Sequence, residues 1–587
     1  LGLERFMNDE LASIPDIDLD LPRDIRAELL ERIWTAFDSD RAALVCSFAT
    51  YRTRSAIRDI GKVLDLPAAE IDKLAKMSEL WGSNSVAEEM QHAPEFASKT
   101  DAPIWRDLIQ LASELMGMPR HIGQHVGGIV LSKDSLKSSV PIEPARWAGR
   151  YVIQWDKDSV DDAKMVKIDL LGLGMLSLVE DCLSLIEDRR GTAPDLGRIP
   201  HDDTVVYDRI CQADTIGLFQ IESRAQISSL RMTQPRNLED LAIQVALIRP
   251  GPIMAGAFHP FMETRQRAVR GEPVEIRYAH PCLETVLRET LGVIIFQDQV
   301  LQVAMVAAGY SAGEAERLRR AMSRRRSREV MELEWPRFCQ GCADKHGMGA
   351  AAAEAIFKQL LAFAAFGFPK SHSVAFALLA YESAWLRNYF PAEYLAALLN
   401  AQPMGFYEPH VLIGDGQRHG LAVLPPAVNA SGAQCIVESD TVIRLGLDRV
   451  TSVSLDTAKG VVGERQANGT FGSLFDFVHR THLKRDQIEA LIKSHAFDEY
   501  GLRPRELLWQ LGLFFIPRAP GQSQLDLPTS QSMVRLAQLN AWEQLREDYS
   551  HLGLSTELHP LALLRPKLAG LPTTQDLWHM KEGTAVT

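Results

Sequence analysis

The chain has 587 residues, of which 46% are hydrophobic and 24% charged, and it carries a net charge of −13. At roughly 150 residues per domain this length predicts about four domains, and the composition excludes a mainly disordered chain. The negative net charge gives no general support for nucleic-acid binding, so a nucleic-acid site would need a local basic patch.

The cysteines and the hydropathy indicate a cellular compartment. Seven cysteines are scattered along the chain except for the Cys339 and Cys342 pair, and an odd number without a leader is typical of a reducing compartment. No stretch reaches the roughly 18 apolar residues of a membrane span. We therefore expect a cytoplasmic protein without a membrane partner. Because the sequence starts with Leu1 rather than Met, we also expect a fragment of a longer protein.

The first predicted element is a strand with one acidic face. Residues 14–21 alternate apolar and acidic side chains, so Asp16, Asp18 and Asp20 would point the same way. After Pro22 the period becomes helical, and the text from about residue 42 to 117 is interpreted as mostly helical. Short buried strands are then expected at HVGGIVLS and KMVKIDLLGLG, so strands flank a helical insertion.

The remaining chain is predicted to be mainly helical. Helices dominate from about residue 176 to 399, and turn signals at 249–252 and 366–369 interrupt them. A smaller domain at about 421 to 512 contains the strand-like TVIRLGL and the helix-forming LKRDQIEALIKSHAF. The polar segment IPRAPGQSQLDLPTSQS is interpreted as a linker, followed by a helix and a short tail.

The acidic residues suggest a metal site. Neighbouring carboxylates on one strand face repel unless a cation lies between them, and Mg²⁺ prefers oxygen ligands while leaving positions for substrate phosphates. Asp169 is a further acid in an otherwise apolar strand, where a carboxylate without a partner is costly. A lone D-x-D is more often an exposed strand edge or a helix cap. Together with Asp169 it makes a two-metal arrangement plausible.

Two basic segments could bind anions. ERLRRAMSRRRSRE holds seven arginines, with no acid among them, whose field would attract polyphosphate or a nucleic-acid backbone, and the alternative is a solvated helix face. In FGFPKSHS, the residues Lys370 and His372 precede an apolar helix whose N-terminus could hold a phosphate. Spacing alone favours an ordinary capped helix there. Cys339 and Cys342 lack the second ligand pair of a structural zinc site, so zinc is not predicted.

Long motifs carry a family resemblance. PDIDLDLP, HVGGIVLS, VKIDLLGLGML, ALIRPGPI, LRRAMSRRR and GFPKSHSVAFALLAYESAWLRNYFPAEY occur in this order over about residues 1 to 500. The chain thereby resembles the bacterial DNA polymerase III alpha-subunit family, and PRHIGQHVGGIVLS, PKSHS and LLNAQPMGFY resemble its error-prone branch. The resemblance implies template-directed DNA synthesis from dNTPs with two Mg²⁺ ions, in damage-induced mutagenesis and translesion synthesis.

The resemblance also implies a fold. We expect a mixed α/β, multidomain chain with a nucleotidyltransferase-type palm whose sheet is split, a helical thumb, large and mainly helical fingers, and a helix-hairpin-helix-like module. The expected boundaries are palm 1–47 and 125–175, thumb 48–124, fingers 176–420, helix-hairpin-helix-like DNA-binding region 421–512, and linker with the start of an oligonucleotide-binding barrel 513–587.

By the same resemblance, the catalytic metal ligands are Asp16, Asp18 and Asp169. The nucleotide pocket or primer-template path would involve the basic residues of the other motifs, namely Lys167, Arg249, Arg319, Arg320, Lys370 and His372.

Three departures from the family pattern limit these expectations. The palm element that precedes PDxDxD is absent along with the amino-terminal phosphoesterase-type domain, which leaves open whether this fragment is active alone. Ser452 and Ser454 stand where the hairpin normally has glycines, which puts its grip on DNA in doubt. QLDLP resembles a clamp-binding peptide but has Pro528 where an aromatic residue is usual, so a plain linker is the better interpretation.

Partners beyond primer-template DNA and dNTPs would be accessory mutagenesis proteins and, with less support, the sliding clamp. Two other function classes stay open. A noncatalytic DNA-binding scaffold would retain DNA without making product, and a metal-dependent phosphoesterase using the same acids would shorten the primer.

Overall fold

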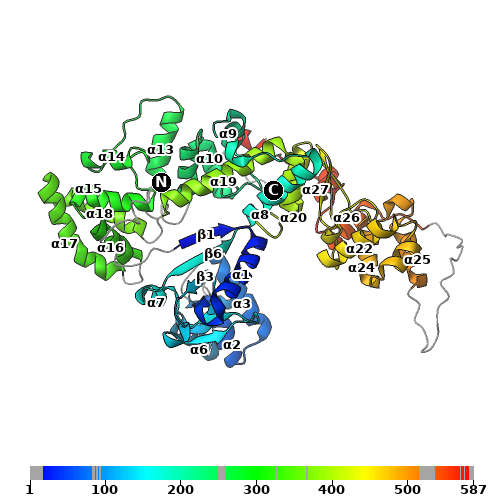
Figure 1. The fold of residues 1–587 in the computed structure, drawn as a ribbon, viewed down its shortest axis with the longest axis horizontal. Coiled ribbons are helices and arrows are strands. Elements are labelled where there is room, and N and C mark those ends of the chain that lie inside the picture. The colour runs from blue at the N-terminus through cyan, green and yellow to red at the C-terminus, as the bar shows by residue number, and fades with distance from the viewer. Residues whose placement is uncertain are drawn as a thin grey trace. The chain divides into compact units, whose positions relative to one another are not determined.

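The computed structural model describes residues 17–81, 86–87, 90, 94–248, 258–323, 327–364, 368–514, 536–568, 570–573 and 576–580. The chain divides into two compact units at the boundary between Leu173 and Gly174 (Figure 1). The first unit combines a sheet with helices and the second is mainly helical, so the predicted mixed α/β, multidomain class is confirmed. Among the described residues, no helix is long and apolar enough to cross a membrane.

The first unit is built on a six-stranded mixed sheet with the order β1-β6-β3-β2-β5-β4. The strands come from both ends of this unit, so the predicted split sheet is confirmed. Their bounds are β1 Ile17–Leu21, β2 Ala42–Thr50, β3 Pro119–Leu131, β4 Ile142–Pro144, β5 Tyr151–Ile153 and β6 Lys167–Gly172.

Each face of this sheet has its own apolar core. On one face, helix α1 (Arg23–Arg41) packs Leu30 and Ile33 against Leu44 and Leu170. On the other face, helix α7 (Lys157–Asp162) contributes Val160 to a core with alternate residues of β2, β3 and β5. These three strands are therefore fixed from both sides, whereas Ile17 and Leu19 of the edge strand β1 are exposed.

Strand β2 differs from the sequence prediction, which interpreted the text from residue 42 as mostly helical. Ala42–Thr50 is a strand whose first five residues are all buried. A short run of apolar residues cannot be assigned to helix or strand by periodicity, because burial on both faces removes the alternation.

The insertion between β2 and β3 is helical, as predicted, and has a separate core that includes Ile57, Leu74, Phe96 and Trp105. Its helices are α2 Thr53–Val63, α3 Ala68–Trp81, α5 Pro94–Ala97 and α6 Pro103–Leu115.

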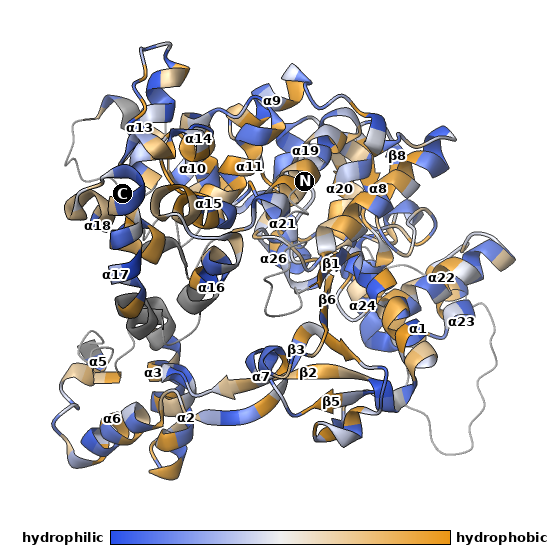
Figure 2. Ribbon diagram, turned by 60° about the vertical axis from the view of Figure 1, so that its left-hand side comes forward, coloured by the Kyte–Doolittle hydropathy of each residue, from blue (hydrophilic) through white to orange (hydrophobic). Residues whose placement is uncertain are grey.

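The second unit begins with a large helical region. Helix α19 packs against α11, and α20 packs against α8. Eight of the ten residues of α20 are buried, and the helix is apolar over most of its length (Figure 2). The bounds are α8 Gly174–Arg190, α9 Thr204–Cys211, α10 Arg224–Thr233, α11 Leu238–Leu247, α13 Phe258–Val269, α14 Glu284–Leu287, α15 Gln297–Ala308, α16 Ala312–Ser323, α17 Ser327–His346, α18 Ala350–Ala364, α19 Lys370–Tyr389, α20 Pro391–Asn400 and α21 Pro409–Arg418.

A small sheet and a further helical cluster follow. The sheet has the order β7-β9-β8, and the cluster packs around Phe471, Phe477 and Phe497. The bounds are β7 Ala422–Leu424, β8 Ile436–Ser439, β9 Val442–Arg444, α22 Leu455–Asn468, α23 Leu474–Thr481, α24 Arg485–Lys493, α25 Pro504–Phe514, α26 Ala541–His551 and α27 Pro560–Leu564. The predicted linker lies outside the described residues.

Short 3-10 helices complete the secondary structure. They are η2 Leu136–Ser138, η3 Leu196–Arg198, η4 Pro281–Leu283, η5 Leu447–Arg449, η6 Asp498–Tyr500, η7 Arg565–Lys567 and η8 Asp576–His579.

Candidate active site

Two acidic residues from distant parts of the sequence are neighbours on one face of the sheet in the first unit. Strands β1 and β6 are parallel neighbours, and Asp18 is the cross-strand partner of Asp169. Partners in register point to the same face of a sheet, so both carboxylates lie on one face. Asp20, two residues further along β1, shares that face opposite Leu171. Asp16 lies outside the described residues.

Asp169 is held by one internal cation but keeps one oxygen without a partner. The Nζ of Lys167, two residues earlier on β6, donates to Oδ2 of Asp169 at 2.8 Å, and both side chains are largely buried. Oδ1 of Asp169 is buried and accepts no hydrogen bond from any residue that the structure describes. A buried acceptor without a partner costs about 1–3 kcal/mol. An unsatisfied carboxylate oxygen on the face shared with Asp18 fits the oxygen donors that Mg²⁺ takes.

On the neighbouring strand β3, a glycine lies next to Oδ1 of Asp169. Gly128 is the cross-strand partner of Asp169, and a Cβ at Gly128 would lie 3.1 Å from Oδ1 of Asp169 and 2.8 Å from Nδ1 of His125. His125 therefore lies in the same site, with its Nδ1 3.7 Å from that oxygen. The sequence pattern HVGG predicted only part of a strand and did not identify His125 as a site residue. The pattern that could have indicated it is a histidine followed, after Val126, by the glycines at 127 and 128.

Comparison with known proteins assigns the family. Residues 1–172 match the family described as bacterial DNA polymerase III alpha NTPase domain, and residues 175–346 match its bacterial DNA polymerase III alpha subunit finger domain. Residues 420–507 match a helix-hairpin-helix motif. The chain belongs to the bacterial DNA polymerase III alpha-subunit family.

Several similar members of the DNA polymerase III alpha-subunit family are named error-prone DNA polymerase. Those of Anaeromyxobacter dehalogenans and Corynebacterium efficiens are each 39% identical over 100% of this chain and 52% of their own length. The one from Burkholderia pseudomallei is 40% identical over 97% of this chain and 54% of its own length. The chain thus spans about half the length of the curated relatives it matches.

The other residues suggested by the family motifs lie in the second unit. At the N-terminus of α19, the backbone N–H of Lys370 donates to Oδ2 of Asp298 at 2.6 Å, and Nζ of Lys370 pairs with Glu289 at 2.6 Å. The ring of His372 packs against Phe368 and Phe376. Two carboxylates of the protein thus already pair with Lys370, and a phosphate would compete with them for its donors.

The basic segment of α16 has one described pair. Arg319 donates from Nε and Nη2 to both carboxylate oxygens of Glu316, at 2.9 and 2.6 Å, and both side chains are largely buried. The side chain of Arg320, and Arg249 as a whole, lie outside the described residues. Arg319 is therefore held within its own helix, and the alternative of a solvated helix face stays open for the other arginines.

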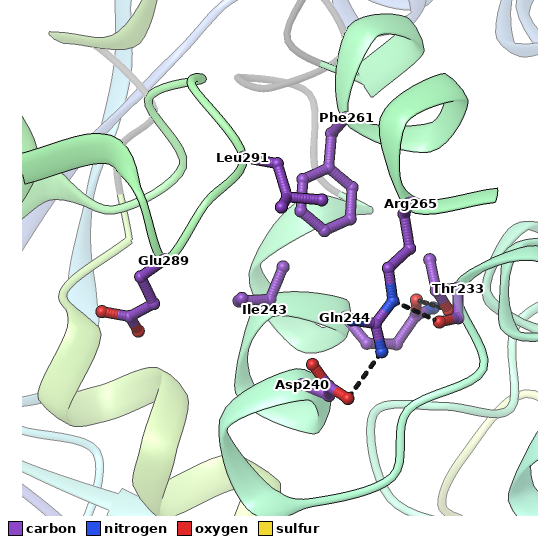
Figure 3. Close-up of a pocket in the computed structure, with 8 residues that line it drawn as sticks. All are labelled: Thr233, Asp240, Ile243, Gln244, Phe261, Arg265, Glu289 and Leu291. Atoms are coloured by element: carbon purple, nitrogen blue, oxygen red, sulfur yellow. Dashed lines mark hydrogen bonds and ion pairs between the residues drawn. The ribbon is translucent and has the colours of Figure 1, made fainter. Parts of the chain in front are cut away.

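A small pocket lies between α10, α11 and α13 (Figure 3). Arg265 donates to the backbone oxygen of Thr233 at 2.8 Å and to Asp240 at 2.6 Å, and Thr233 donates to Gln244 at 2.8 Å. Glu289, the partner of Lys370, also lines it. With a volume of about 30 Å³ the pocket has room for water rather than for a nucleotide.

The second unit contains another group of acids, whose charge is balanced by an arginine of the protein. Asp214, Asp415 and His419 place their donor atoms within 4.8 Å of one another. Arg387 lies between the two carboxylates and donates to Asp214 at 2.8 Å and to Asp415 at 2.7 Å. Because a guanidinium already occupies the space between the acids, this group is a network that joins α19 to α21 rather than a metal centre.

The helix-hairpin-helix region shows how the chain accommodates the two serines. Ser452 has φ of +72°, a left-handed conformation that favours glycine, so the turn is kept at a cost of about 1 kcal/mol. Ser454 caps α22, where its hydroxyl accepts the N–H of Thr457. The turn geometry thus survives without the glycines, and DNA contact at this turn stays a prediction.

Proposed function

We propose that the first unit carries the catalytic centre of an error-prone DNA polymerase, which transfers nucleotides from dNTPs to the 3′-hydroxyl of a primer on a DNA template. The observation that carries this proposal is the register of Asp18 against Asp169, with the unsatisfied Oδ1 of Asp169 on the shared face. Membership of the family and the names of the relatives support it.

In this proposal Asp18 and Asp169 bind two Mg²⁺ ions, with Asp16 as the third acid of the family motif. Bound Mg²⁺ would lower the pKa of the attacking hydroxyl and stabilise the leaving pyrophosphate. Lys167 holds the Asp169 carboxylate in one orientation through Oδ2, which leaves Oδ1 to face the ligand. The pairing of β1 with β6, and the packing of Leu170 of β6 against helix α1, fix the separation of the two acids before substrate arrives.

Basic residues of the second unit would bind the triphosphate and the DNA backbone. We propose Arg249, Arg319, Arg320, Lys370 and His372 for this role, together with Lys167 of the first unit. For Lys370 and Arg319 the substrate would compete with the carboxylates of Asp298, Glu289 and Glu316 that pair with them now. Such an exchange would make nucleotide binding depend on ionic strength.

The cellular role proposed is damage-induced mutagenesis and translesion synthesis in the cytoplasm. It rests on the names of the relatives. Proposed partners are primer-template DNA, accessory mutagenesis proteins and, with less support, the sliding clamp.

The test is primer extension with Mg²⁺ and four dNTPs on a short template, comparing the 587-residue chain with a form extended by the upstream segment of a relative. We expect the extended form to add only nucleotides complementary to the template, and omission of one dNTP to stop synthesis at the matching base. Retention of DNA without product by both forms would favour the scaffold, and shortening of the primer would favour the phosphoesterase.

A further inference from the structure

We propose that His125 is a positioning residue for Asp169, and that the bulge at residues 125–128 keeps Oδ1 of Asp169 available to a cation. This inference rests on the proposed metal site and deepens it. His125 would act through Asp169, without binding metal or substrate itself.

The first step is the irregular pairing of β2 with β3. Leu44 pairs with Ile129 and Cys46 pairs with Gln124, so the single residue Val45 on β2 lies opposite the four residues 125–128 on β3. The extra residues form a bulge beside Asp169, since Gly128 is the partner of Asp169 on β6. Bulges next to active sites redirect side chains.

The second step is the way the bulge is fastened. Nδ1 of His125 accepts the backbone N–H of Gly128 at 2.7 Å and, more weakly, that of Gly127 at 3.3 Å. From helix α1, Arg26 donates to the carbonyl of Val126 at 2.6 Å and to the carbonyl of Leu170 at 2.7 Å. The bulge is thus tied to β6 at the residue directly after Asp169.

Gly127 and Gly128 are required because neither position has room for a side chain. A Cβ at Gly127 would lie 2.8 Å from the carbonyl oxygen of Leu170, and a Cβ at Gly128 would lie 2.8 Å from Nδ1 of His125. A side chain at either position would push β3 away from β6 or displace the ring. The close approach of His125 to Asp169 therefore depends on the pair of glycines.

The third step is which nitrogen of the His125 ring carries the proton. A ring nitrogen that accepts N–H groups presents a lone pair, so the proton of the neutral imidazole is on Nε2. Nδ1 lies 3.7 Å from Oδ1 of Asp169 and has no hydrogen to donate to it. A ring released from the glycine amides could carry its proton on Nδ1 and donate to Oδ1, which would compete with a cation. The bulge prevents this competition.

The test uses Mn²⁺ as a paramagnetic probe, with its binding to the 587-residue chain followed by electron paramagnetic resonance. The His125→Asn variant keeps an oxygen that can accept the glycine N–H groups, whereas His125→Phe keeps a ring without an acceptor. We expect His125→Phe to weaken Mn²⁺ binding about 10-fold or more, as is typical for residues that orient metal ligands, and His125→Asn to stay within about 3-fold of the parent. His121→Ala, on the same strand, is the matched control and should leave the affinity unchanged.

Equal Mn²⁺ affinity of His125→Phe and the parent would overturn the inference, as would equal weakening by His125→Asn and His125→Phe. If His125→Phe does not fold, His125→Leu also removes the acceptor at this position and should give the same loss. A parent chain that binds no Mn²⁺ would instead overturn the proposed metal site, so the two failures can be told apart.

Discussion

Two groups of acids in this molecule have opposite surroundings. In the second unit, Arg387 donates to both Asp214 and Asp415, and the guanidinium holds the pKa of Asp214 below its ordinary value although burial opposes this. In the first unit, Lys167 satisfies only Oδ2 of Asp169, and Oδ1 has no hydrogen-bond partner among the described residues. Clustering of acids therefore does not define a metal site, and neither does an unsatisfied oxygen alone, since Oε2 of Glu393 is also buried without a hydrogen-bond partner there. The informative feature is an unsatisfied acid oxygen with a second acid in register beside it, as Asp18 is to Asp169.

The largest expected effect comes from removing the charge of the unsatisfied acid. Asp169→Asn or Asp18→Asn should lower primer extension about 10³-fold or more, because the charge that would hold the metal is lost. Extension rates with Mg²⁺, measured on an active form of the chain, check this.

Asp20→Asn is the matched control, since Asp20 lies on the same strand face but opposite Leu171. It should keep the rate within about 10-fold of the parent. An Asp169→Asn protein that extends primers at the parental rate would remove Asp169 from the centre.

Removing the internal cation of the other group should affect stability instead. Arg387→Ala removes the cation that Asp214 and Asp415 share. Each largely buried acid then keeps one hydrogen-bond partner among the described residues, His419 and Arg418 respectively, so the free energy of unfolding should fall by about 3 kcal/mol. Urea unfolding of the parent and the variant measures this difference. Arg387→Lys keeps the charge but cannot donate to both acids with the planar geometry of a guanidinium. Its free energy of unfolding should therefore lie between those of the parent and Arg387→Ala. A loss below about 1 kcal/mol in Arg387→Ala would mean that the guanidinium does not balance these acids.

The strand positions of the acids could be read from the sequence, but their surroundings could not. Alternation around Asp18 and the apolar flanks of Asp169 predicted strands, and β1 and β6 are strands. Their pairing in register is a long-range contact that neither segment encodes. His125 was missed because a bulge breaks the alternation on which strand prediction relies. The Glu316 partner of Arg319 stands three residues earlier, a spacing that sequence reasoning could have used.

The smallest expected effect concerns a third group of acids, whose internal cation can titrate. Hydrogen bonds that the His495 ring donates to the carboxylates of Asp498 and Asp548 raise the pKa of His495 to about 10. The group joins the segment that follows α24 to α26, since His495 stands two residues after the end of α24 and Asp548 lies on α26. Because the folded pKa is above the ordinary value of 6.5, the stabilisation is fully present below pH 6.5 and is lost as the pH rises through about 10.

Unfolding measured across this pH range should therefore show a fall in the parent that His495→Gln lacks. The same fall in His495→Gln would assign it to other groups.

The most direct test of the metal site is a Mn²⁺ titration of the parent chain, Asp18→Asn, Asp169→Asn and Asp415→Asn, followed by electron paramagnetic resonance. We expect the parent and Asp415→Asn to bind Mn²⁺ alike, and Asp18→Asn and Asp169→Asn to lose at least about 10-fold in affinity. Parental affinity in Asp169→Asn, or loss of binding in Asp415→Asn alone, would contradict the assignment of the metal site to β1 and β6.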